Sequence, residues 1–249
     1  MPTSDSALQG PARFHSTQWS VVLRAKDLAA DDRITAMSDL FRRYWYPLYS
    51  FCRGRGGNHH DAEDATQGFF LQLMNNEDCF AAVSQDKGRF RAFLLASFKN
   101  FLANQYRNAS TLRRGGNVEI CSIDSKDFIA NYNLDANLQQ TPEQLFEFNY
   151  VKTLLSRVRA RLEEDYQQAN KVHIFTLLIP HLTNVVDGLP RTEIGKLLNL
   201  SPAAVNMSIH RMRRRYGEIL RDEVLATLDD PRDLDDELRY LFSIAGTIK

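Results

Sequence analysis

The chain is poor in cysteine and has no long apolar run. Its 249 residues include only Cys52, Cys79 and Cys121, and their wide spacing excludes the short paired motifs of zinc sites. Such cysteines are typical of free thiols in a reducing cytoplasm. No stretch approaches the ~20 apolar residues of a membrane span, and the polar residues 1–16 lack the apolar core of a signal peptide. We therefore expect a soluble cytoplasmic protein with a disordered N-terminus and no membrane partner.

Net charge is also lacking, because 31 Lys and Arg balance 31 Asp and Glu. This balance argues against a protein that coats nucleic acid by bulk positive charge. The charges are nevertheless segregated along the chain. Residues 87–118 hold seven basic side chains and no acid, residues 201–216 hold four arginines and no acid, and residues 217–240 hold nine acids against three arginines. The two basic segments predict two separate contacts with phosphate.

Alternating strand patterns and internal repeats are absent, and helical periodicity dominates. The predicted fold class is all-α, with two small helical domains joined by a flexible linker and a helix-turn-helix in the second. We expect helices from about residue 17 and over about 31–52, 60–74, 89–108, 142–166, 171–182, 192–198, 202–228 and 234–244. The predicted divisions are a disordered N-terminus (1–16), a first domain (17–110), a linker (111–141), a second domain (142–228) and an acidic tail (229–249).

Residues 191–216 have the pattern of a helix-turn-helix. Thr192 is expected to cap a short first helix, a turn follows at residues 199–200, and Ser201 with Pro202 begins the second helix. Apolar residues then recur at intervals of four, three and four, as Val205, Ile209, Met212 and Tyr216. The alternative is a helical hairpin within a larger bundle.

The opposite face of that second helix is predicted to contact DNA. Small and polar residues stand near its N-terminus and arginines follow, an order that suits base edges first and phosphates next. The residues assigned to this contact are Ser201, Ala203, Asn206, Met207, His210, Arg211, Arg213 and Arg214.

A second basic segment, residues 88–108, combines aromatic residues with cations. A positive groove with aromatic or polar groups is typical of sites for single-stranded nucleic acid. We expect most of the phenylalanines to lie in the core, and the alternative for the arginines is a solvated face. The residues assigned to nucleic-acid contact are Arg89, Arg91, Lys99, Asn100, Asn104 and Arg107.

The helix over residues 60–74 begins with a cluster of acids, at Asp61, Glu63 and Asp64. Three interpretations stay open: capping of the positive end of the helix dipole, a metal site together with His59 and His60, or a docking face for another protein. Consecutive helical positions diverge by about 100°, which disfavours convergence on one metal ion.

Taken in order, these segments resemble the sigma-70 family of RNA polymerase sigma factors, in its compact two-domain extracytoplasmic-function branch. The docking helix of that family, region 2.2, is similar to DAEDATQGFFLQL. The promoter-melting and −10 helix, regions 2.3 and 2.4, is similar to KGRFRAFLLASFKNFLANQYR. Region 4.2, which reads the −35 element, is similar to EIGKLLNLSPAAVNMSIHRMRRRY.

The resemblance implies a promoter-specificity subunit with no catalytic residue, cofactor or metal of its own. Its implied partners are core RNA polymerase and promoter DNA, both duplex and melted strand, with an anti-sigma factor as a further candidate. The residues 201–214 assigned above would read the −35 element. Asn100 and the loop of residues 78–87 would capture a flipped base at −10, while the basic residues of that helix grip the backbone. Docking on the polymerase falls to Asp61, Asp64, Gln67 and Phe70.

Two rival functions remain open at this stage. A stand-alone helix-turn-helix regulator explains residues 192–216 equally well, but it gives no role to the acidic helix. A metal-dependent nuclease would use the cluster of residues 59–64. The acidic tail is open as well: it is either a solvated capping helix or an autoinhibitory segment that folds over a basic DNA-binding face.

Overall fold

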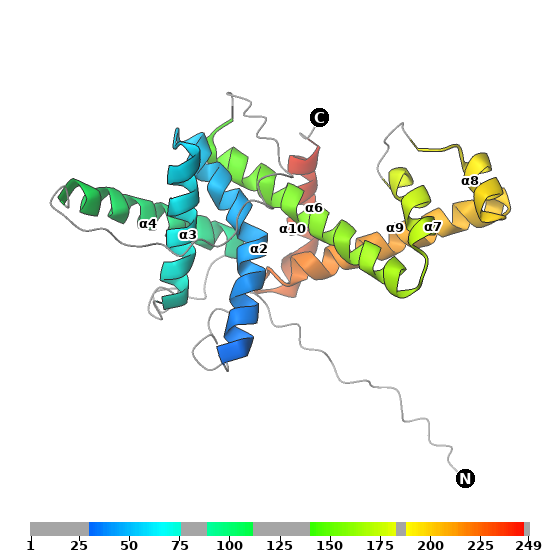
Figure 1. Cartoon of the computed structure of the whole chain (residues 1–249), viewed down its shortest axis with the longest axis horizontal. Helices are drawn as coiled ribbons and strands as arrows, with labels where there is room; N and C mark the ends of the chain where they lie inside the picture. Colours follow the sequence, from blue (N-terminus) through cyan, green and yellow to red (C-terminus); the bar gives the residue numbers. More distant parts are fainter. Residues whose placement is uncertain (1–29, 76–88, 112–139, 183–187, 247–249) are drawn as a thin grey trace, which may run out of the picture.

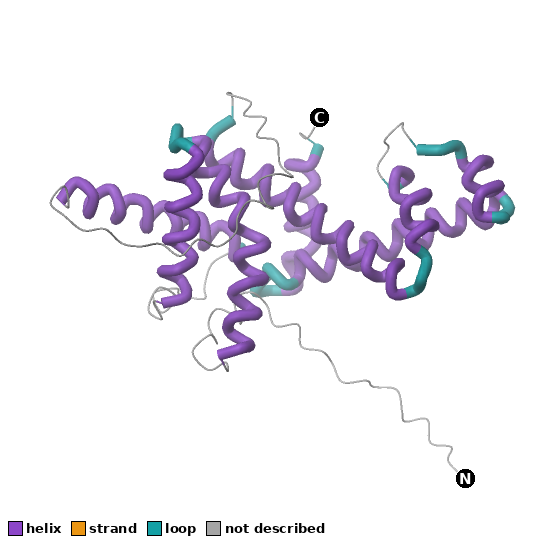
Figure 2. The backbone as a smooth tube through the Cα atoms, viewed as in Figure 1, coloured by secondary structure: helices purple, strands orange, loops and turns teal. Residues whose placement is uncertain are grey.

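The structure, a computed structural model, describes residues 30–75, 89–111, 140–182 and 188–246. Every regular element in these ranges is helical (Figure 2), so the predicted all-α class is confirmed. The helix expected near residue 17, the loop of residues 78–87 and most of the predicted linker lie outside the described residues. The described elements are α2 (Ala30–Gly54), α3 (His59–Asn75), α4 (Phe90–Thr111), α6 (Pro142–Gln168), α7 (Val172–Leu178), η2 (Ile179–His181), α8 (Arg191–Leu198), α9 (Pro202–Leu225), η3 (Pro231–Asp233) and α10 (Leu234–Ala245).

The long helices α6 and α9 connect two ends of the molecule. Helices α2, α3 and α4 lie at one end, and α8 with the start of α9 lies at the other (Figure 1). Helix α6 packs along α2 and then against α9. Helix α10 packs against α6 and α9 and brings the acidic tail back to the middle of the molecule.

Helix α6 begins where the sequence predicts, because its N-terminus is capped twice. The Thr141 hydroxyl accepts the Gln144 N–H at 3.2 Å, and the Gln144 side chain accepts the Thr141 N–H at 2.8 Å. Pro142 occupies the first turn, where its missing N–H costs nothing. This reciprocal cap fixes the direction in which α6 enters the core.

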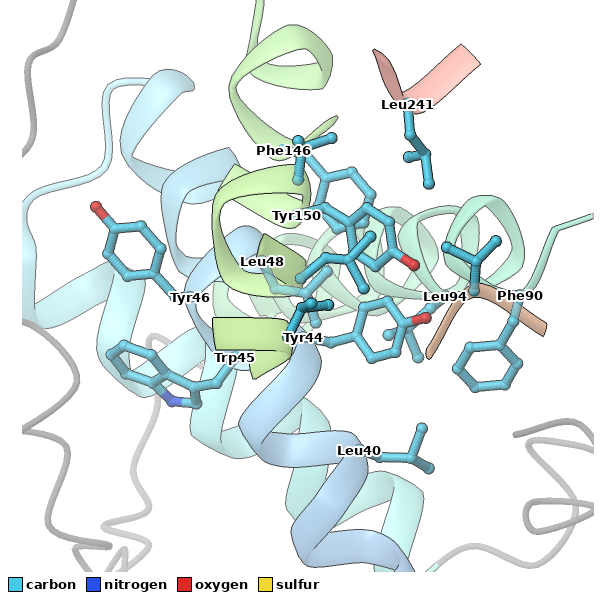
Figure 3. Packing of buried hydrophobic residues seen from close by; sticks show 14 of the residues in the cluster. Leu40, Tyr44, Trp45, Tyr46, Leu48, Phe90, Leu94, Phe146, Tyr150 and Leu241 are labelled. Atoms are coloured by element: carbon cyan, nitrogen blue, oxygen red, sulfur yellow. The ribbon is translucent and has the colours of Figure 1, made fainter. Parts of the chain in front are cut away.

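The buried residues form one cluster that extends from α2 to α10. Figure 3 shows Tyr44 and Leu48 of α2 facing Phe146 and Tyr150 of α6, with Leu241 of α10 nearby. The rings of Tyr44 and Tyr150 are nearly parallel, with centroids 5.6 Å apart. Full burial of each such side chain stabilises the fold by about 1.5–3 kcal/mol. The first half of α6, which the sequence assigns to the second domain, is therefore packed against the first.

Candidate nucleic-acid interface

The turn of the helix-turn-helix depends on a close backbone approach. Asn199 adopts the left-handed conformation with φ at 52°, which ends α8 and reverses the chain. The Leu200 N–H then donates to the Gly195 carbonyl at 2.8 Å. A Cβ on Gly195 would lie 2.8 Å from the Leu200 carbonyl oxygen. Only glycine fits that position without a shift of the backbone.

The caps of the two helices differ. Ser201 caps α9 as the sequence predicts, because its hydroxyl accepts the Ala204 N–H at 3.2 Å. The prediction that Thr192 caps α8 was wrong: the N-cap residue is Pro190 and no side chain bonds there. Helix α8 begins two residues earlier than a Thr192 cap requires, because the Pro190 carbonyl already accepts the Ile194 N–H at 3.1 Å.

Helix α9 has the two faces expected from its sequence. Val205, Ile209 and Met212 are at most 3% exposed and hold the helix against the core. Met207 is 53% exposed although it is apolar, which is typical of a contact surface rather than of a core position. The residues predicted to contact the −35 element are all exposed: Ser201, Ala203, Asn206, Met207, His210, Arg211, Arg213 and Arg214.

Several side chains on this face are oriented by neighbours. Arg191 donates to the Asn206 Oδ1 at 3.0 Å, and Arg213 donates to the carbonyl oxygen of His181 at 2.7 Å. Arg214 lies 3.3 Å from Glu218, one turn further along α9. These contacts leave the helix face polar, positively charged and open to solvent.

The start of α4 differs from the start of α9, because acidic side chains of α6 and α10 form ion pairs with its arginines. Arg91 is 2% exposed and contacts Glu237 of α10 and, at 2.8 Å, Glu147 of α6. Burial alone would lower the pKa of Arg91, but its acidic neighbours raise it, so the guanidinium is charged. Burial raises the pKa of Glu147 against the opposite effect of Arg91. Arg89 lies 2.5 Å from the same Glu237.

These ion pairs correct part of the predicted −10 contact. Arg91 was expected to grip the DNA backbone, but in this arrangement it is buried among protein groups. Lys99, half exposed, forms an ion pair with Glu143 at 2.6 Å, and that pairing holds the pKa of Glu143 below its ordinary value. Asn100, Asn104 and Arg107 are exposed on the second half of α4.

Helix α3 presents only part of the predicted docking set. Asp61 and Asp64 are exposed, whereas Gln67 is 7% exposed and Phe70 is 3% exposed. The Phe70 ring lies 5.1 Å from that of Phe41. Phe70 is therefore a core residue in this structure, because it follows Asp61 by nine positions and so points about 180° away.

A buried carboxylate that sequence reasoning missed links three helices. Glu223 of α9 is 2% exposed and lies 2.6 Å from Arg43 of α2, with Arg161 and Arg157 of α6 at 2.7 Å and 3.3 Å. Burial alone would raise the pKa of Glu223, but Arg43 and Arg157 hold it below its ordinary value. The sequence did hold one indication of this burial: Glu223 follows Met212 by eleven residues, about three helical turns, and so lies on the same apolar face of α9.

Cys52 is a buried free thiol, and burial raises its pKa to about 11. Within the described ranges no three His, Cys, Asp or Glu side chains are arranged to hold a metal ion. None of the described helices is both long and apolar enough to cross a membrane.

Comparisons with known proteins agree with this architecture. The family model described as Sigma-70 region 2 matches residues 40–111, which span most of α2, all of α3 and α4. The chain is also 29% identical over 211 residues to the ECF RNA polymerase sigma factor SigW of Bacillus subtilis (strain 168). That alignment covers 80% of this chain and 96% of the relative. No solved structure matches the chain.

Residues 40–111 therefore match region 2 of the sigma-70 family, and four fifths of the chain is similar to an extracytoplasmic-function RNA polymerase sigma factor.

Proposed function

We propose that this protein binds core RNA polymerase and directs promoter-specific initiation of transcription. The observation that carries the proposal is the exposed, arginine-flanked face of α9 in a chain whose α2–α4 unit matches sigma-70 region 2. Neither feature alone requires polymerase. Together they combine a duplex-reading helix at one end of the molecule with a polymerase-binding and strand-binding unit at the other (Figure 1).

The −35 contact is assigned to the exposed face of α9 in the major groove. Asn206 suits adenine, which offers a donor and an acceptor to one amide, and Met207 suits the methyl group of thymine. The Asn206 Oδ1 already accepts from Arg191, but an amide oxygen has a second lone pair for a base. Arg211 and Arg214 stand further along the helix, where phosphates would lie.

The −10 contact is assigned to the second half of α4. Asn100 and Asn104 can bond the edges of unstacked bases, and Arg107 can pair with a phosphate. These three side chains lie on the exposed surface. The loop of residues 78–87 is proposed to complete this contact and lies outside the described residues.

Polymerase docking is assigned to the exposed acids of α3, Asp61 and Asp64. Changing both to alanine should abolish association with purified core polymerase and run-off transcription from a genomic promoter library. A matched control changes two exposed acids outside α3, Glu164 of α6 and Asp229 between α9 and η3, and should leave both readouts intact. A stand-alone regulator predicts instead that DNA binding is independent of polymerase and that neither double variant alters it.

The proposed role needs no catalytic group in this chain, since the polymerase performs the chemistry. It does need the two DNA-binding faces to reach elements separated on one promoter. The predicted linker, residues 111–141, is proposed to allow that separation, with α6 leaving α2. An anti-sigma factor is a candidate partner for the arrangement described here, in which α6 packs against both α2 and α9.

A further inference from the structure

Helix α10 brings a carboxylate and an aromatic ring onto the start of α4. Glu237 is 1% exposed and contacts both Arg89 and Arg91. The Tyr240 ring centre lies 4.5 Å from the guanidinium carbon of Arg89 and 5.0 Å from that of Arg91. These distances are within the range of cation–π attraction. One helix therefore supplies an ionic and an aromatic partner to each arginine.

We propose that α10 is an autoinhibitory helix, which must undock before Arg89 and Arg91 can bind the backbone of a promoter strand. This inference rests on the proposed function, because it requires α4 to be the strand-binding helix. A phosphate oxygen and the carboxylate of Glu237 compete for the same guanidinium donors. The Tyr240 ring also covers the guanidinium planes on which a base would stack.

The attachment of α10 can be released by a competing anion. Helix α10 buries Leu238 and Leu241, but Tyr240 remains 36% exposed and Phe242 57% exposed. Two ion pairs hold the Glu237 carboxylate, because its Oε2 atom pairs with Arg89 and its Oε1 atom pairs with Arg91. A phosphate that pairs with the same guanidinium groups would replace both contacts. A ligand with stronger affinity for the open state therefore shifts the equilibrium.

Undocking of α10 removes Leu238 and Leu241 from the core but leaves the packing of α2 against α6 in place. Arg91 keeps its partner Glu147 on α6, so no buried cation loses every acid. Residues 226–233, which include η3, are the chain connection between α9 and α10, and Arg221 of α9 also pairs with Asp235 of α10 at 3.2 Å. The helix can therefore leave α4 while the helix-turn-helix keeps its fold.

The test compares two charge-neutralising variants on the same helix of the full-length chain. Glu237→Gln removes the buried carboxylate, and Asp236→Asn removes an exposed one that pairs with Arg239 of the same helix. The probe is a labelled single-stranded DNA of random sequence, about 20 nucleotides long, measured by fluorescence anisotropy across salt concentrations. Glu237→Gln should bind on the order of tenfold more tightly at low salt, with a slope steeper by about 0.7–1.4, for one or two added phosphate contacts. Asp236→Asn should match the wild type.

A third variant separates failure of this inference from failure of the proposed function. Arg107→Gln should weaken binding whether or not α10 is docked. If it does so while Glu237→Gln and Asp236→Asn bind alike, autoinhibition is wrong and strand binding by α4 stands. If Arg107→Gln also has no effect, α4 is not the strand-binding helix and the proposed function fails at that site.

Hydrogen exchange of the Glu237→Gln variant checks that the gain comes from release of α10. Amides of residues 234–245 should lose protection, while those of α4 and α6 keep it. Loss of protection throughout α4 and α6 would show that Glu237 holds the core together, and it would overturn the proposal.

Discussion

Helices α4 and α9 both carry arginines in their sequence, but the two helices differ in the exposure of those arginines. Each begins in a segment without acids. In α9, Arg211, Arg213 and Arg214 are exposed at one end of the molecule. In α4, Arg91 is buried between acids that lie 56 and 146 residues away in the chain. The charge of a segment therefore does not predict the charge that its surface presents, because acids from distant elements can neutralise it.

The largest expected effect follows from removing the buried guanidinium of α4. Arg91→Ala leaves the partly buried Glu147 and the buried Glu237 without their shared cation, and it should lower the free energy of unfolding by about 3–5 kcal/mol. Arg214→Ala, on the open helix, should change it by less than about 0.5 kcal/mol, since that side chain is 75% exposed. Urea denaturation measures both. Equal effects of the two variants would mean that α4 is as open as α9 in solution.

The next largest effect on stability is expected at Glu223, whose ion pairs connect α9 to α2 and α6. Glu223→Gln keeps the shape but removes the charge that faces three arginines, and it should cost about 2–4 kcal/mol. Glu218→Gln is the matched control on the same helix, because Glu218 is about half exposed. If the loss of unfolding free energy is no larger than in the control, the ion pairs of Glu223 do not stabilise the packing of α9 against α2 and α6.

The same carboxylate predicts a pH dependence. Because the folded pKa of Glu223 lies below its ordinary value of 4.5, its stabilising contribution is complete above pH 4.5 and is lost as the pH falls through the lower folded value. The stability gap between wild type and Glu223→Gln, measured by denaturation at successive pH values, should be constant near neutrality and shrink in acid. A gap that widens in acid would mean that the pKa is raised. Glu147, whose pKa is raised, has the opposite slope in both proteins and cancels in the difference.

A smaller effect is expected at the turn of the helix-turn-helix. Gly195→Ala places a Cβ 2.8 Å from the Leu200 carbonyl oxygen and should cost about 1–3 kcal/mol. Gly217→Ala, at a helical position with no neighbour within 4 Å, should instead stabilise by about 0.5–1 kcal/mol. Thermal unfolding of both variants is the measurement. A neutral Gly195→Ala variant would show that the turn can relax.

The arginines of α9 that are assigned to phosphate contact should affect stability least. Their removal should instead alter DNA binding. Arg211→Ala and Arg214→Ala should each lower the salt slope of duplex binding by about one. Arg239→Ala, an exposed arginine on α10, is the control and should leave the slope unchanged. Holoenzyme binding to promoter DNA across salt concentrations measures all three. An unchanged slope in both α9 variants would remove these arginines from the phosphate contact.

Features specified by neighbouring residues were predictable from the sequence. The Ser201 cap, the turn at Asn199 and the buried stripe of α9 each follow from interactions within a few residues, and so does the start of α6 at Thr141. The side of α3 that faces the core was predicted less accurately. Phe70 was assigned to docking by resemblance, but it is buried with its ring against Phe41 of α2, and only packing reveals which side of a helix another helix covers.

Local sequence patterns were enough to predict a helical protein, a helix-turn-helix over residues 191–216 and two separate basic segments. Each of these depends on periodicity, capping and composition over short distances. The packing of distant helices exposes Arg211, Arg213 and Arg214 on α9 but buries Arg91 at the start of α4, and no local pattern predicts that difference. Desolvation and ion pairing depend on which distant groups share a site, and Arg91 meets Glu147 and Glu237 only when α6 and α10 fold against α4.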